Sequence, residues 1–175
     1  MQQGWFLAAL LAGGLAAAIA GLLVGAPSLR LKGDYLAIVT LGFGQIIGVV
    51  VRNIDSLGGA LGLNGIPART NLFWVLAAAT TTIYGVTALV NSTHGRGFIA
   101  THDDEVAAEA MGLDTTRYKI MAFVTGAFFA GVAGGLLGHF KLTISPKEFD
   151  FNRSIEVVVM VIVGGMGRKI GRAHV

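Results

Sequence analysis

Uncharged stretches alternate with short polar segments along this 175-residue chain. Four stretches contain no Asp, Glu, Lys or Arg, namely residues 1–29, 35–51, 70–95 and 120–140. A helix needs roughly 20 apolar residues to cross the hydrocarbon core of a bilayer. The pattern therefore predicts membrane-spanning helices at residues 5–26, 71–90 and 118–140.

Two further apolar stretches are too short to span the core in full. Residues 35–51 form a marginal span that needs Leu31 or Asn53 drawn in, or else an interrupted or re-entrant helix. Residues 155–167, IEVVVMVIVGGMG, begin as a fifth span and stop short. We expect an all-α, polytopic transmembrane helix bundle of about four full spans plus a truncated fifth.

The composition supports a membrane protein. The mean hydropathy is +0.70, hydrophobic residues make up 54% of the chain and charged residues 13%, whereas about a quarter of the residues of a soluble domain are charged. The first apolar stretch has no basic start and far exceeds the roughly 7–15 apolar residues of a secretory signal. We therefore interpret it as a true span.

The formal charge of +3 comes from the last eight residues. Arg168, Lys169 and Arg172 lie there, and the rest of the chain holds ten basic and ten acidic residues. The net charge therefore gives no reason to expect binding to nucleic acid.

The last residues, KIGRAHV, are similar to the translation of a short-read sequencing adapter. We therefore interpret residues 1–167 as the transmembrane domain and residues 168–175 as a non-native tail that packs against nothing. A basic cytoplasmic tail is the alternative.

Small residues recur at i, i+4 spacing inside the predicted spans. Such positions let helix backbones approach closely, which holds helices together in lipid. The sets are Ala17/Gly21/Gly25, Gly44/Gly48, Ala127/Gly131, Gly131/Gly135 and Gly134/Gly138. The pattern predicts dense helix–helix packing.

Motifs for catalysis, nucleotide binding and metal binding are missing. The Gly-rich segment 56–67, SLGGALGLNGIP, lacks the Lys–Ser/Thr pair that ends a P-loop. The chain has no cysteine, and its spans hold no convergent Ser/His/Asp, paired-Asp or zinc-ligand set. We expect no enzymatic activity and no catalytic site, metal site or cofactor in this chain. The segment 56–67 is either an external connection or part of a pathway wall.

A charged, alanine-rich segment, THDDEVAAEAMGLDTTRYK at residues 101–119, separates two predicted spans. We predict a short helix from Asp103 to Met111, capped by Thr101 and stopped by Gly112. Because its charges are costly to bury in hydrocarbon, this helix is expected outside the bilayer.

Glu105 and Glu109 fall on one side of this helix. The opposite arc is apolar and consists of Val106, Ala107, Ala110 and Met111. Three functions fit: a solvated connector on the bilayer surface, a helix that docks into a groove of another protein, or a metal or carboxylate site. The last would use His94, His102, Asp103 and Asp104, although consecutive acids point about 100° apart on a helix.

The segment EVAAEAMGLDTTRYKIMAF resembles the cytoplasmic loop of ATP-binding-cassette (ABC) importer permeases, whose pattern is Glu-Ala-Ala, three residues, then Gly. Ala107, Ala108 and Gly112 keep this spacing, whereas Val106 stands in place of the acid and Glu105 lies one residue early. Four further segments resemble successive parts of branched-chain amino-acid permeases of the LivM type: GDYLAIVTLGFGQI, LGLNGIP, HFKLTISPKEFDF and SIEVVVMVIVGGMG. The resemblance extends over residues 21–167.

The resemblance implies a multi-pass permease subunit of an ABC importer for branched-chain amino acids in the bacterial plasma (inner) membrane. It also implies a fragment, incomplete at both ends. The implied partners are two ATPase subunits that bind the ATP, a homologous second permease subunit, an external substrate-binding protein and membrane lipid. The acidic helix becomes a coupling helix, and its implied ATPase-docking residues are Asp104, Glu105, Ala107, Ala108, Glu109 and Gly112.

A substrate path and a second class of function are further hypotheses. The helix at 35–51 has a marginal length and contains four residues typical of an interrupted helix that lines a path, namely Thr40, Gly42, Gly44 and Gln45. Simple packing against neighbouring helices explains these residues equally well.

An ion-coupled secondary transporter or channel for a small polar solute normally carries ionisable residues inside its spans. Only Lys119 and Glu156, at span ends, fit that description. Five basic residues fall on each side, so charge does not fix the orientation.

Overall fold

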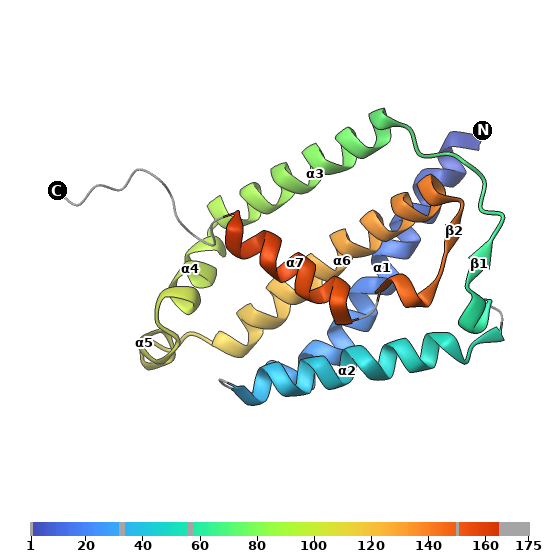
Figure 1. Cartoon of the computed structure of the whole chain (residues 1–175). Coiled ribbons are helices and arrows are strands. Elements are labelled where there is room, and N and C mark those ends of the chain that lie inside the picture. Colours follow the sequence, from blue (N-terminus) through green and yellow to red (C-terminus); the bar gives the residue numbers. More distant parts are fainter. Residues whose placement is uncertain (1, 32–33, 56–57, 150, 165–175) are drawn as a thin grey trace. The chain divides into compact units, whose positions relative to one another are not determined.

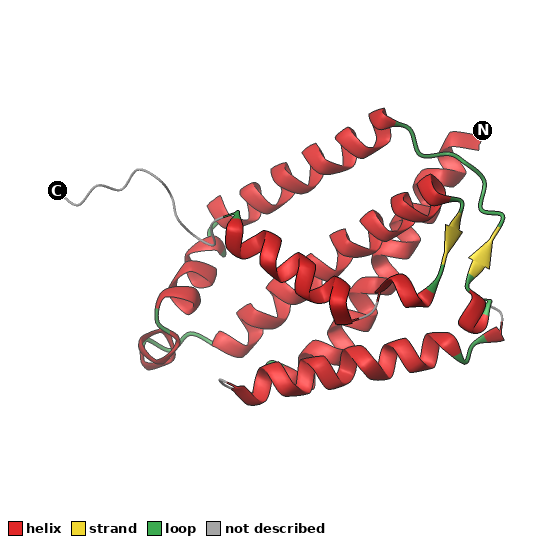
Figure 2. Cartoon of the chain, viewed as in Figure 1, coloured by secondary structure: helices red, strands yellow, loops and turns green. Residues whose placement is uncertain are grey.

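The computed structural model describes residues 2–31, 34–55, 58–149 and 151–164, and helices dominate this part of the chain (Figures 1 and 2). The α-helices are α1 (Gln2–Ser28), α2 (Asp34–Arg52), α3 (Leu72–Asn91), α4 (Gly95–Asp103), α5 (Glu105–Ala110), α6 (Thr115–Lys141) and α7 (Phe151–Val163). The minor elements are the short 3-10 helices η2 (Gly59–Leu61) and η3 (Pro146–Phe149), and the paired strands β1 (Leu63–Asn64) and β2 (Thr143–Ile144). The predicted all-α fold is confirmed.

The three long predicted spans correspond to α1, α3 and α6, which are the helices long and apolar enough to cross a bilayer within the described residues. The marginal span is α2, whose apolar part covers only Ile38–Arg52. The truncated fifth is α7, which has 13 residues. The predicted tail, residues 168–175, lies outside the described residues.

The described residues fall into two compact units. The first unit comprises residues 1–43 and 65–143, and therefore holds α1, the beginning of α2, and α3 to α6. The second comprises residues 44–64 and 144–175, with the end of α2, η2, β1, η3 and α7.

Helices α1 and α6 make the most extensive contact between elements. Their backbones approach so closely that a Cβ atom added to Gly131 would lie 2.5 Å from Cβ of Ala17 and 2.8 Å from the carbonyl oxygen of Gly13. A Cβ added to Gly21 would lie 2.7 Å from Cβ of Ala127. The predicted role of these small residues in close helix packing is thereby confirmed for α1 and α6.

Other small residues in the predicted pattern face open space. A Cβ added at Gly134, Gly44 or Gly48 would meet no atom within 4 Å. Their spacing matches that of the packed glycines, so spacing alone does not tell which face of a span meets a neighbour. The prediction of dense packing is therefore correct for one face of α6 and is not met by α2.

A small core joins α1, α3 and α6 near the end of the first unit where α1 begins. Phe6, Leu10 and Leu136 are buried, and Trp74 of α3 packs against them. The rings of Phe6 and Trp74 meet edge to face with centroids 5.3 Å apart, a favoured aromatic geometry. Helix α3 itself contributes no fully buried residue, and Trp74 is partly buried.

The connection that leads into α3 is fastened to the C-terminal end of α6. Thr70 Oγ1 donates to the carbonyl oxygen of Leu136 at 3.0 Å. His139 Nδ1 lies 2.9 Å from the carbonyl oxygen of Pro67, and because a carbonyl only accepts, this nitrogen carries the proton. Helices α4 and α5 therefore lie at the opposite ends of α3 and α6.

The close α1–α6 contact generates the first prediction. Replacing Gly131 by Leu places a large side chain where even a Cβ would overlap α1, and we expect a loss of roughly 1–3 kcal/mol of stability from overpacking. The measurement is thermal unfolding of the purified chain in detergent. Gly134→Leu, where the space is open, is the matched control, and an equal loss in both variants would contradict the assigned interface.

Candidate functional site

Helix α5 begins at a residue that serves two helices. Asp104 is extended at φ −153° and ψ 104°, and its backbone N–H donates to the carbonyl of Ala100 at the end of α4. Its Oδ1 accepts from the N–H of Ala107 at 3.0 Å. Aspartate at an N-cap satisfies a backbone donor that a helix start otherwise leaves unpaired. Asp104 therefore separates α4 from α5 and caps α5.

The C-terminal end of α5 is fixed by a glycine turn. Gly112 has φ +83°, and its N–H donates to the carbonyl of Glu109 at 2.9 Å. The N–H of Leu113 donates to the carbonyl of Ala108 at 3.0 Å. These two bonds form a Schellman motif, in which glycine enters the left-handed region without steric cost. The predicted stop at Gly112 is confirmed.

The predicted start of this helix is wrong by two residues. Asp103 belongs to the end of α4, and Thr101 lies inside α4, where its Oγ1 donates to the carbonyl of Gly97 at 2.8 Å. Asp104 takes the capping role because an aspartate at this place reaches the N–H three residues on.

Sequence reasoning missed α4 because it contains two glycines, which weaken helices. The structure gives a reason for Gly97. A Cβ there would meet the ring of Tyr118, and the neighbouring Phe98 packs against the same ring edge to face, with centroids 5.3 Å apart. The missing side chain lets α4 lie against α6. A glycine next to an aromatic residue was the available signal.

The apolar arc of α5 faces away from the protein. Val106 and Met111 are 72% and 84% exposed, and Ala107 and Ala110 are exposed as well. Ala108 points the other way and is 4% exposed. We call Val106, Ala107, Ala110 and Met111 the outer face of α5.

The two glutamates of α5 face α6. Glu105 Oε1 forms a salt bridge with Nζ of Lys119 at 2.5 Å, and these side chains are only 26% and 21% exposed. Thr115, which is 1% exposed, donates its hydroxyl to Glu109 Oε1 at 2.8 Å. The six predicted docking residues thus do not lie on one face of α5. Among them, only Ala107 belongs to the outer face. Their role in docking stays a prediction.

The residues of the alternative metal site are not brought together. His102 Nδ1 lies 3.2 Å from Asp103 Oδ1 at the exposed surface, while the carboxylate of Asp104 caps α5. Within the described residues, no three or more His, Cys, Asp or Glu side chains are placed to share a metal ion. The geometry gives the metal hypothesis no support.

Of the alternatives for residues 35–51, the interrupted helix is not observed. Helix α2 is continuous, and Thr40 Oγ1 donates to the carbonyl of Leu36 at 2.8 Å, four residues back as in regular helix. Gly42 and Gly44 have open space around them, and Gln45 is exposed. Glycine weakens a helix by only about 1 kcal/mol, which an apolar environment without competing water overcomes. A role in a substrate path stays a prediction.

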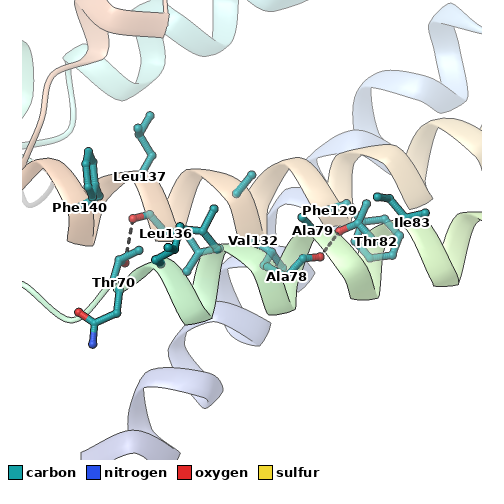
Figure 3. A pocket seen from close by; sticks show the side chains of 14 residues that line it. Thr70, Ala78, Ala79, Thr82, Ile83, Phe129, Val132, Leu136, Leu137 and Phe140 are labelled. Carbon is teal, nitrogen blue, oxygen red and sulfur yellow. Dashed lines mark hydrogen bonds between the residues drawn. The ribbon is translucent and has the colours of Figure 1, made fainter.

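Each of the two units contains a hollow among its described residues. A groove of about 780 Å³ runs between α3 and α6 (Figure 3), and Thr70 and Thr82 in it donate to carbonyls at 3.0 and 2.8 Å. Because these hydroxyls are satisfied, the groove offers apolar surface to its surroundings. In the second unit, a cavity of about 320 Å³ is lined by Gly44, Ile47, Gly48, Val51, Leu63, Ile144, Pro146 and Phe149.

Comparison with known proteins gives a family match over nearly the whole chain. Residues 1–174 match the family described as branched-chain amino acid transport system / permease component. The chain is 35% identical, over 189 residues, to the high-affinity branched-chain amino acid transport system permease protein LivM of Salmonella typhimurium (strain LT2) and to that of Escherichia coli (strain K12). Each alignment covers 88% of this chain and 44% of the relative.

A shorter match is to the permease protein LivH of the same Salmonella typhimurium strain, with 36% identity over 76 residues, 43% of this chain and 24% of the relative. The chain spans less than half the length of the LivM proteins that it matches. No solved structure matches it.

The turn at Gly112 generates the second prediction. Gly112→Val has room for its side chain, but valine in the left-handed region costs roughly 1–2 kcal/mol. We expect faster hydrogen exchange of the amides of Leu113 and Gly112 with the spans still inserted. Gly112→Asn is the control, since asparagine enters this region readily. Equal exchange in the valine variant and the wild type would contradict the prediction.

Proposed function

This chain belongs to the family of permease components of branched-chain amino acid transport systems, and we propose that the whole protein is the permease subunit of an ABC importer that carries branched-chain amino acids across the bacterial plasma membrane. The uptake is energised by partner ATPase subunits. This chain itself holds no cofactor and catalyses no reaction, because the partners bind and hydrolyse the ATP.

The observation that carries this proposal is the outer face of α5. Six residues form a helix between the ends of two long apolar helices and expose an apolar arc. An isolated helix of this length is not stable in water, so the rest of the protein maintains α5 although the residues of its apolar arc are exposed. Small apolar faces of this kind suit a groove on another protein. We assign the ATPase as that protein and place α5 on the cytoplasmic side.

The relatives support one further partner, a second permease subunit. The chain is similar both to LivM and, over a shorter stretch, to LivH, which supports pairing with a homologous second permease subunit. Two ATPase subunits and an external substrate-binding protein complete the proposed importer.

The alternative, an ion-coupled secondary transporter or channel, has less support. Such proteins place ionisable side chains inside their spans. The two candidates at the span ends are Lys119, which pairs with Glu105, and Glu156, which pairs with Arg153 at 2.5 Å. Both are therefore engaged in local ion pairs, and energy from a partner ATPase explains transport without an ion-binding site in the spans.

The third prediction tests the substrate path along α2. If this helix lines a path, cysteines placed at Thr40 and Gln45 in the reconstituted importer react with a water-soluble maleimide, and leucine slows the reaction. This chain contains no cysteine, and any cysteines in the rest of the importer are first replaced by serine so that labelling reports the introduced residue alone. A cysteine at Ile83, exposed on α3, is the control for a lipid-facing site. Complete protection at positions 40 and 45 in every nucleotide state rejects the path.

The fourth prediction tests the docking surface. Met111→Asp introduces a charge into the outer face, and we expect the ATPase to copurify at least about tenfold less, which corresponds to roughly 1.4 kcal/mol. Leu61→Asp is the matched control, since Leu61 is 86% exposed and Met111 84%, while Leu61 lies outside the α4–α5 segment. Normal copurification of the Met111 variant would remove the outer face as the docking surface.

A further inference from the structure

We infer that Glu105 and Glu109 are positioning residues that fasten α5 to the first turns of α6, so that a displacement of α5 is passed to a membrane span. This inference rests on the proposed function, in which an ATPase contacts the outer face of α5. It assigns the two glutamates to the permease side of the coupling rather than to the contact with the ATPase.

The two helices present matching pairs of side chains. Glu105 and Glu109 are four residues apart, and so are Thr115 and Lys119, so each pair lies on one helix face. Lys119 meets Glu105 at 2.5 Å, and Thr115 meets Glu109 at 2.8 Å. The hydroxyl of Thr115 also lies 3.5 Å from Glu105 Oε1. The hydroxyl of Thr115 and the ammonium group of Lys119 on α6 therefore hold the carboxylates of both glutamates of α5.

Burial strengthens the part of this contact formed by Glu105, Lys119 and Thr115, whereas Glu109 is exposed. The Thr115 side chain is almost completely buried, and about three quarters of the Glu105 and Lys119 side chains is shielded from solvent. A hydrogen bond to an ionised carboxylate is stronger than one between neutral groups, and shielding reduces the screening that weakens surface ion pairs. Ala108 is buried on the same side of α5, so the backbones can approach closely.

A short turn is the backbone connection between α5 and α6. Four residues, 111–114, connect the helices, and Gly112 among them adopts φ +83° with no atom within 4 Å of an added Cβ. The side-chain contacts of Glu105 and Glu109 add a second connection between α5 and α6 beside this turn. We expect a displacement of α5 to pass to α6 through these contacts.

The test uses the full-length permease with its second permease subunit, its ATPases and its binding protein in proteoliposomes, and measures leucine uptake and ATP hydrolysis together. For Glu105→Lys, we expect the ATPase to copurify normally while the ratio of leucine transported to ATP hydrolysed falls by about tenfold. The double variant Glu105→Lys with Lys119→Glu restores the ion pair with reversed charges and should restore the ratio.

Two further variants separate charge from position. Asp103→Lys makes the same charge change at an exposed residue that lies next to His102. We expect this variant to leave the ratio of leucine transported to ATP hydrolysed unchanged. Thr115→Val removes the hydroxyl that Glu109 accepts, keeps the side-chain size and the net charge, and should lower the ratio in the same direction. This variant keeps the inference testable if Glu105→Lys fails to fold.

The outcomes distinguish the inference from the proposed function. Loss of ATPase copurification in Glu105→Lys that the reversed pair does not restore would place Glu105 in the contact with the ATPase and overturn the inference. An unchanged transport ratio in both Glu105→Lys and Thr115→Val would overturn it as well. If the wild-type importer neither copurifies with an ATPase nor couples leucine uptake to ATP hydrolysis, the proposed function itself fails.

Discussion

The close approach of α1 and α6 is the contact on which the rest of the first unit depends. In lipid, apolar side chains gain nothing by leaving the hydrocarbon, so helices associate where their backbones fit. Gly21 and Gly131 provide that fit, because a Cβ at either would overlap the opposite helix. Helix α6 is thereby held in its middle. It contacts α5 at its first turns, and at its other end it receives the connection into α3 through Thr70 and His139.

Much of the fold follows from the sequence because hydropathy and length are strong signals in membranes. Charge-free stretches of about 20 residues have few alternatives to helix where water is absent, and α1, α3 and α6 lie where the pattern predicts them. The Gly112 turn was predictable for a similar reason, since glycine is the residue that closes a helix in the left-handed region at no cost. The family likewise followed from short segments spread along the chain, and the match over residues 1–174 agrees with it.

The features that sequence reasoning missed depend on tertiary contacts. Helix α4 forms although it contains two glycines, because Gly97 gives room to the ring of Tyr118. Helix α2 is continuous although two glycines and Thr40 suggested an interruption, because an apolar environment without competing water favours the backbone hydrogen bonds of the helix. The Thr40 hydroxyl donates within the helix, to the carbonyl of Leu36. The direction in which the glutamates of α5 point was also not predictable. Periodicity separates the two faces of a helix, but only the neighbouring Lys119 and Thr115 determine which face turns inward.

That direction decides how a helix of six residues can act as a docking element. Such a short helix gains too little from its own hydrogen bonds to persist alone, and an alanine-rich arc buries too little area to anchor it in lipid at about 25 cal/mol per Å². It must therefore be held from its inner side. Glu105 and Glu109 supply this hold through Lys119 and Thr115, which leaves the outer face with Met111 available to a partner. If the acids pointed outward, α5 would gain charge for the partner and lose its attachment to α6. The arrangement observed attaches α5 to α6 by its charged face and leaves its apolar face exposed. The proposed coupling requires this division, because a force applied at the apolar face would then reach α6 through the charged one.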